Sequence, residues 1–193
     1  AEESKSLSYA SILIEKLLAK GANKSSYLIG IGGGITCDIT GFIASIFMRG
    51  INFAFIPTTL LAITDASIGG KNGVNFNKIK NIVGTINEPN FIIIDLSFLK
   101  TLEKKECYNG CAEIIKHACV SSSKLFSFLE KVDIEYKSEK FFSSILRKSI
   151  SIKLDVVSKD LKDLGRRRIL NFGHTFGHAI ESKNNISHGQ AIA

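Results

Sequence analysis

The sequence has few features that would break or crosslink a globular fold. Only 2 of its 193 residues are proline and 45% are hydrophobic, a composition typical of a folded protein and not of a disordered one. No apolar run reaches the roughly 18 residues that a membrane span requires, so we expect no membrane partner. The charged residues 1–5 do not resemble a secretory signal.

Cysteine and clustered charge are scarce too. The four cysteines (Cys37, Cys107, Cys111 and Cys119) show no disulfide spacing, so we expect reduced thiols and a cytoplasmic protein. The net charge is +7, but no block of five like charges occurs, and residues 166–168 form the one arginine cluster. We therefore expect no nucleic-acid partner. A small anionic molecule suits the positive charge equally well.

The first half of the sequence alternates between strand and helix patterns. Short apolar runs predict buried strands over 27–31, 51–56 and 91–95. Helical spacing predicts helices over 8–20, 35–47 and 60–68, and glycines predict a loop over 69–75. These patterns indicate an α/β domain with a mainly parallel, Rossmann-like sheet.

The second half has helix patterns instead. They cover 109–118, 125–132, 140–159 and 169–182. We therefore expect an all-α domain to follow the α/β domain, with ranges 1–102 and 103–193.

A glycine run separates the first predicted strand from the helix that follows it. Such a turn lets backbone N–H groups approach a nucleotide phosphate at the helix N-terminus. The run Gly32-Gly33-Gly34 lacks the G-x-G-x-x-G spacing, so a simple tight turn is the alternative. Asp38, one turn into the helix, either faces the same ligand or complements the helix dipole.

Several polar residues stand out against apolar or glycine-rich surroundings. Asp65 is a lone acid among apolar neighbours, and a buried carboxylate needs partners. Lys71, Lys80 and Asn81 lie in or after the second glycine-rich stretch, where they suit a phosphate or a carboxylate. Each lysine is individually also compatible with ordinary surface charge.

Three histidines lie close together near residue 180. His174 and His178 are one helical turn apart, with Glu181 on the same face, and His188 follows. Imidazoles spaced in this way can hold a zinc ion. Threonine follows His174, so the general base of an H-E-x-x-H protease is absent. A second polar face is predicted in helix 109–118, from Glu113, Lys116 and His117.

Several motifs, taken in order, resemble the 3-dehydroquinate synthase family: GGGITCDITGF, PTTLLAITDASIGGKNGVN, AEIIKHA, RRRILNFGHTFGHAIE and HGQAIA. The resemblance implies an NAD-binding Rossmann-like domain followed by a helical metal-binding domain. It implies conversion of 3-deoxy-D-arabino-heptulosonate 7-phosphate to 3-dehydroquinate and phosphate in the shikimate pathway of aromatic amino acid biosynthesis. It also implies NAD, a divalent metal (zinc foremost, cobalt as the alternative) and a homodimer.

The resemblance further implies a role for individual residues. The implied metal ligands are Glu113, His174 and His188, which moves His178 from the metal to the region of the substrate phosphate. The other implied positions are catalytic Asp65, Lys71 and Lys116; substrate-binding Arg49, Asn81, Lys153, Arg167 and Asn171; and NAD-contacting Gly33, Gly34, Asp38, Thr58, Thr59, Lys80 and Thr101. Arg49 would reach the phosphate site of a neighbouring subunit.

The sequence also departs from the family pattern. It begins inside the family's NAD domain and stops before its last helices, so we expect a fragment of low activity by itself. The link between His178 and His188 is shortened, and Asp163 and Gln190 stand where the family typically has glutamate. The alternatives are a related sugar-phosphate cyclase, a metal-dependent polyol dehydrogenase and an inactive remnant.

Overall fold

The computed structural model describes residues 2–77, 79–132, 139–183 and 186–192. The chain divides into two compact units. The first consists of Ala1–Thr58 and Ala66–Asp95, and the second of Thr59–Asp65 and Leu96–Ala193. The domain ranges 1–102 and 103–193 stay predictions.

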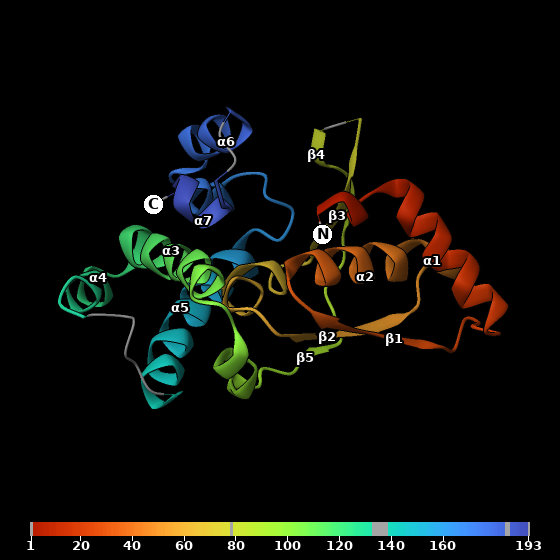
Figure 1. The fold of residues 1–193 in the computed structure, drawn as a ribbon, viewed down its shortest axis with the longest axis horizontal. Helices are drawn as coiled ribbons and strands as arrows, with labels where there is room; N and C mark the ends of the chain where they lie inside the picture. Colours follow the sequence, from red (N-terminus) through yellow and green to blue (C-terminus); the bar gives the residue numbers. More distant parts are fainter. Residues whose placement is uncertain (1, 78, 133–138, 184–185, 193) are drawn as a thin grey trace. The chain divides into compact units, whose positions relative to one another are not determined.

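The first unit contains a three-stranded parallel sheet. Its order is β1 (Tyr27–Gly32), β2 (Asn52–Pro57) and β5 (Phe91–Ile92), which confirms a parallel arrangement. Helix α1 (Leu7–Ala19) contacts α2 (Gly34–Ile46), and α2 packs on β1 and β2 (Figure 1). The same unit contains two short 3-10 helices, η1 (Glu2–Ser4) and η2 (Phe47–Arg49).

The glycines of β1 allow α2 to approach the strand very closely. A Cβ atom at Gly30 would lie 2.6 Å from Thr40 Oγ1, and one at Gly32 would lie 2.5 Å from Thr36 Oγ1. Any larger residue would push the helix away from the sheet. The predicted order of strand, glycine turn and helix is confirmed, with Gly33 as the N-cap of α2.

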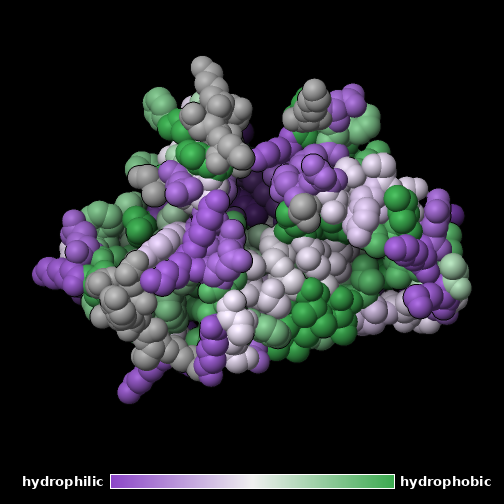
Figure 2. Space-filling view, in the orientation of Figure 1, coloured by the Kyte–Doolittle hydropathy of each residue, from purple (hydrophilic) through white to green (hydrophobic). Residues whose placement is uncertain are grey.

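The other face of the sheet is exposed. Ile29 is 50% exposed, Ile31 58% and Phe91 46%, and Figure 2 shows hydrophobic surface where β2 and β5 lie in Figure 1. The prediction that β1 and β5 are buried strands is therefore wrong for this face. The physical reason is that α2 covers the face that carries Gly30 and leaves Ile29 and Ile31 on the opposite side.

The predicted loop over 69–75 is also wrong. Residues Lys71–Phe76 form β3, which pairs antiparallel with β4 (Ile79–Ile86) and has an irregularity between Val74 and Phe76. The Asn72 side-chain amide donates to the carbonyls of Gly70 and Asn87 and so ties the open end of the hairpin. Two other predictions need shortening: the strand over 91–95 ends at Ile92, and the helix over 60–68 is mainly a π-helical turn, η3 (Ala62–Ala66).

The second unit is built from helices, as predicted. They are η3, η4 (Leu96–Thr101), α3 (Lys104–Ser121), α4 (Ser123–Leu129), α5 (Glu139–Lys159), η5 (Arg166–Asn171), α6 (His174–Lys183) and α7 (His188–Ile192). Residues from η3, α3, α4 and α5 share one apolar core, among them Ile63, Ile114, Leu125 and Ile145.

The single helix predicted over 169–182 is wrong in one respect. It is two elements, η5 and α6, separated at Phe172 and Gly173. Gly173 has φ +80, a left-handed conformation that interrupts the helix and that glycine adopts without strain.

None of the helices described here is long and apolar enough to cross a membrane.

Candidate metal centre

Helix α3 presents three polar side chains in the interior of the second unit. Glu113 and His117 are fully buried and Lys116 is nearly so. Their spacing places them on one side of α3, while Ile114 and Ala118 join the apolar core. The predicted polar face of this helix is confirmed, and each of its members needs a polar partner.

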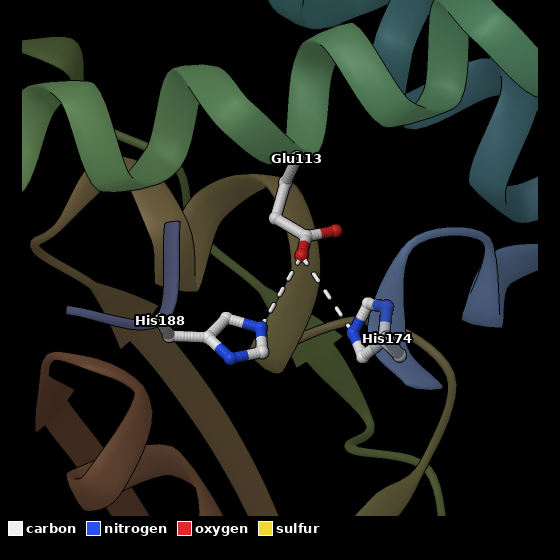
Figure 3. A group of neighbouring side chains, drawn as sticks. All are labelled: Glu113, His174 and His188. Atoms are coloured by element: carbon white, nitrogen blue, oxygen red, sulfur yellow. Dashed lines mark ion pairs between the residues drawn. The ribbon is translucent and has the colours of Figure 1, made fainter. Parts of the chain in front are cut away.

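Glu113 faces two imidazoles from the last part of the chain (Figure 3). Its Oε1 atom lies 3.5 Å from Nε2 of His188 and 4.0 Å from Nε2 of His174. Four ligands arranged tetrahedrally about zinc at 2.0–2.1 Å stand roughly 3.3 Å apart. The two distances from Glu113 are therefore only slightly longer than the separation between ligands of one ion, and all three donor atoms lie within 4.8 Å of one another. The donor set, one carboxylate and two imidazoles, fits zinc.

The tautomer of His174 is fixed by its own backbone. Nδ1 lies 3.3 Å from the Phe172 carbonyl, which can only accept a hydrogen bond. Nδ1 therefore carries the proton, and the Nε2 lone pair is directed toward Glu113. Burial lowers the pKa of His174, and the ammonium of Lys116 adds to this effect. The neutral imidazole that results is the form that binds a metal.

His188 is placed by a capping box at the start of α7. The backbone N–H and the hydroxyl of Ser187 both donate to Oε1 of Gln190, at 3.2 Å and 2.9 Å. Gly189 lies against α3, where a Cβ atom would be 2.5 Å from the Cα of Asn109. Glutamine closes this box as glutamate would, and the shortened link still lets His188 reach Glu113.

The second oxygen of Glu113 has a partner of its own. Lys116 Nζ forms an ion pair with Oε2, so Oε1 is the atom turned toward the imidazoles. Burial and the nearby Asp65 both raise the pKa of Glu113, but His188 and Lys116 outweigh them and hold it below its usual value. Glu113 is therefore an ionised carboxylate inside the protein.

A second carboxylate, Asp65, is paired with a lysine. Lys153 Nζ lies 2.5 Å from Oδ1 of Asp65 and also donates to its backbone carbonyl. Burial raises the pKa of Asp65, but the ammonium groups of Lys153 and Lys116 outweigh it and hold the pKa well below the usual range. Burial in turn lowers the pKa of Lys153.

His117 completes this cluster. Its Nδ1 is 2.7 Å from the Ser149 hydroxyl, whereas Nε2 is buried and has no hydrogen-bond partner among the described residues. Burial lowers the pKa of His117 to about 4, although Asp65 pulls it upward. The sequence singled out His117 but not Ser149, because 32 residues separate the two and no local pattern links them.

Arg167 is held by a loop that the sequence did not reveal. The Asp160 carboxylate accepts hydrogen bonds from the backbone N–H groups of Leu164, Gly165 and Arg167, at 2.9, 2.8 and 3.0 Å. These donors, that of Arg167 first, hold the pKa of Asp160 below its usual value. The guanidinium of Arg167 is buried and donates to the Leu161 carbonyl at 2.8 Å.

Other predicted residues of the second unit lie at the ends of helices. Thr59 Oγ1 accepts a hydrogen bond from the backbone N–H of Ala62, Thr101 ends η4 and Asn171 ends η5; the last two are exposed. The side chains of His178 and Glu181 lie outside the described part of the structure. The alternative of a metal held by His174 and His178 therefore falls partly outside the described residues, whereas Glu113, His174 and His188 converge.

The remaining predicted residues belong to the first unit. Gly33 and Gly34 begin α2, Asp38 pairs with Lys5 at 2.5 Å, and Thr58 donates its N–H to the Gly32 carbonyl. Lys71 lies in β3, and Lys80 and Asn81 lie in β4. Arg49 is exposed in a turn where Met48 and Arg49 have φ 50 and 60.

Comparison with known proteins identifies the family. The family models "3-dehydroquinate synthase N-terminal" and "3-dehydroquinate synthase C-terminal" match residues 1–109 and 110–193. The chain is 46% identical to the 3-dehydroquinate synthase of Saccharolobus solfataricus over 197 residues, which cover 100% of this chain and 56% of that protein. The chain thus spans about half the length of the curated relatives it matches.

Solved structures of related enzymes share the fold. A 2-deoxy-scyllo-inosose synthase complexed with carbaglucose-6-phosphate, NAD+ and Co2+ has a TM-score of 0.92 and 33% identity. The match covers 100% of this chain and 54% of that chain. The 2-epi-5-epi-valiolone synthase ValA of Streptomyces hygroscopicus subsp. jinggangensis 5008, with NAD+ and Zn2+ bound, has a TM-score of 0.90 and 31% identity, with coverages of 100% and 55%. The matches span this chain from end to end, and the chain belongs to the 3-dehydroquinate synthase family.

Proposed function

We propose that this chain carries the metal- and substrate-binding part of a 3-dehydroquinate synthase. The reaction converts 3-deoxy-D-arabino-heptulosonate 7-phosphate to 3-dehydroquinate and releases phosphate, which makes the enzyme a carbon–oxygen lyase. The observation that carries the proposal is the convergence of His174 and His188 on buried Glu113. The relatives at 46% identity bear the same name.

Glu113, His174 and His188 would hold the divalent ion, and the backbone at Gly33 and Gly34 would receive the pyrophosphate of NAD. Zinc is the first expectation and cobalt the second, which agrees with the Zn2+ and Co2+ of the two related structures. When bound, the metal would polarise a substrate hydroxyl while NAD accepts and later returns a hydride. We propose the following residues as further NAD contacts, as predicted from the sequence: Asp38, Thr58, Thr59, Lys80 and Thr101.

The side chains around Asp65 would bind and orient the substrate. Asp65 is ionised and can accept a hydrogen bond from a substrate hydroxyl, while Lys153 holds its carboxylate in place. Lys116 and Arg167 supply positive charge for an anion, since both are buried cations in the same unit. Lys71, Asn81, Asn171 and His178 are proposed as further substrate contacts.

The test is the balance between phosphate and reduced cofactor. The intact protein, loaded with zinc and NAD+, is expected to release one phosphate for each heptulosonate phosphate without net formation of NADH. Phosphate is measured colorimetrically and NADH by its absorbance. Accumulation of NADH in proportion to substrate would instead identify a metal-dependent polyol dehydrogenase, and no turnover would favour an inactive remnant.

A related sugar-phosphate cyclase is the second candidate. The structural similarity to a 2-deoxy-scyllo-inosose synthase bound to carbaglucose-6-phosphate favours it. Such an enzyme would release phosphate from glucose 6-phosphate, the sugar that the analogue mimics. Comparing kcat/KM for glucose 6-phosphate and for heptulosonate phosphate separates the two candidates.

We also propose a homodimer. Arg49 supports it, because the residue is exposed and stands in a turn with two successive left-handed non-glycine residues, and strain of this kind gathers at functional positions. Arg49→Ala is expected to impair turnover. Adding a metal-free subunit that carries Arg49 is expected to restore turnover, because the added subunit supplies the arginine to its neighbour. The cytoplasmic location stays a prediction from the cysteine content.

A further inference from the structure

Beside the metal centre lies a second group of metal-type donors. One carboxylate oxygen of Asp65, one of Glu113 and one ring nitrogen of His117 lie within 4.8 Å of one another. The two groups are adjoining and not separate, since Glu113 belongs to both. The group therefore either holds a second ion or supports the first.

Local charge argues against a second ion. The ammonium of Lys153 lies against Asp65, and that of Lys116 lies against Glu113. Two cations already occupy the positions where a further metal would need free carboxylate oxygens. The supporting role is the one that the contacts favour.

The hydrogen bond to Ser149 determines what His117 can offer. Nδ1 is engaged with the Ser149 hydroxyl at 2.7 Å, so Nε2 is the ring nitrogen left for the carboxylates. Nε2 is fully buried without a hydrogen-bond partner among the described residues. A proton on Nε2 suits two nearby carboxylates, whereas a lone pair there would be repelled. Ser149 must then donate to Nδ1, and a hydroxyl can do so.

We propose that His117, fixed by Ser149 as the tautomer protonated on Nε2, is a positioning residue. Its N–H dipole lies beside the carboxylates of Asp65 and Glu113 without a direct hydrogen bond to either, and it favours the orientation that they hold beside the metal centre. This inference rests on the proposed metal site and deepens it. The role needs a neutral donor. A third cation beside Lys116 and Lys153 would raise the positive charge that an incoming divalent ion has to overcome. An apolar residue would leave the carboxylates free to move toward the lysines.

The experiment compares three variants by cobalt titration of the intact, metal-stripped protein, followed by the visible absorption of bound Co2+. His117→Leu removes the donor and is expected to weaken cobalt binding by about ten- to a hundredfold. His117→Gln keeps an N–H group near the position of Nε2 and is expected to stay within a few-fold of wild type. Ser149→Ala frees the tautomer and is expected to fall between them, with circular dichroism confirming that each variant is folded.

The kinetic expectation is a fall in kcat at saturating metal, with KM changed less, in the same order of variants. Cobalt binding by His117→Leu equal to wild type overturns the inference, and so does a glutamine variant as weak as the leucine variant. If His117→Leu does not fold, the cobalt affinities of Ser149→Thr and Ser149→Ala are compared instead, because threonine keeps the hydroxyl and alanine removes it. Equal cobalt binding by these two variants overturns the inference. If the variants follow the expected order of cobalt binding but the wild type releases no phosphate, the proposed function alone is contradicted and the role of His117 stays supported.

Discussion

The second unit contains two carboxylates that solve the problem of burial differently. Asp65 has its cation supplied by the chain, because Lys153 contacts both its side chain and its backbone carbonyl. Glu113 has Lys116 on one oxygen and turns the other toward the imidazoles of His174 and His188. The first arrangement is complete in charge, whereas the second brings an ionised carboxylate oxygen and two ring nitrogens close to one point. Such a set is satisfied by an external cation.

The comparison therefore separates two kinds of ionised site within one unit. A pair closed by an ammonium has its charges compensated and its groups held in place, and removing one partner leaves an uncompensated charge. A carboxylate that faces imidazoles contributes to binding, since its satisfaction depends on a ligand from solution. The following predictions test whether the two sites can be disturbed separately.

The largest effect is expected from removing one imidazole of the metal centre. His174→Ala should weaken zinc binding on the order of a thousandfold or more, because two remaining ligands hold zinc poorly. Metal content after dialysis, measured by atomic absorption, provides the test. His178→Ala, on the same helix, is the matched control and should retain zinc near the wild-type level while turnover falls. Equal zinc loss in both variants would restore the two-histidine site.

Acid is expected to act through His117, which lies beside both carboxylates. Its pKa is 6.5 as a free group and about 4 in the fold, so the folded state binds fewer protons between these values. The stability that depends on neutral His117 is then complete above pH 6.5 and is lost as the pH falls toward 4. The difference corresponds to roughly 3 kcal/mol at the acid end. Urea unfolding of the metal-free protein at several pH values measures it, and His117→Gln should show a shallower fall over this window. Parallel curves would contradict the assignment.

The closed pair can be opened from the lysine side. Lys153→Met leaves Asp65 without its cation and should destabilise the fold by about 2–3 kcal/mol. The value is at the low end for such pairs because 34% of the Asp65 side chain is exposed. Urea unfolding of Lys153→Met, Asp65→Asn and the double variant gives the coupling energy. The double variant should be less destabilised than the two single changes together, and simple additivity would show that the pair does not act as a unit.

The smallest effect concerns the support of His188. Gln190→Ala removes the acceptor for Ser187 and should cost about 1 kcal/mol, with a modest loss of zinc affinity. Gln190→Glu keeps the acceptor and should behave like wild type in thermal unfolding and zinc titration. A glutamate variant as impaired as the alanine variant would mean that the capping box does not place His188.

The parts of the fold that sequence predicts well are those with a strong local pattern. The apolar run of β1, its glycines and α2 follow one another within twenty residues, and the helices of the second unit carry helical periodicity. The β3–β4 hairpin was missed because its strands contain glycine, asparagine and lysine instead of alternating apolar residues. Its pairing depends on Asn72, whose partners lie two and fifteen residues away.

The site shows the same division. His174 and His188 stand out because histidine is rare in this chain. Spacing placed Glu113 on a polar helix face, but only the family motifs marked it as a metal ligand. The Lys153–Asp65 pair spans 88 residues and the His117–Ser149 contact spans 32, so no local signal connects these partners. The break at Gly173 was missed because a glycine inside a helical pattern is compatible with an unbroken helix.

The Asp160 turn has a consequence for the order in which the second unit folds. All three of its hydrogen bonds close loops of four to seven residues, and a loop of about ten residues closes in roughly 10–100 ns. The proposed metal ligands meet only after a separation of 75 residues between Glu113 and His188 has been bridged, which costs more chain entropy. The turn that carries Arg167 can therefore form early and repeatedly, while the ligand triad assembles late. A freshly made chain would thus have the arginine that we propose to bind an anion in place before it can hold a metal at the proposed site.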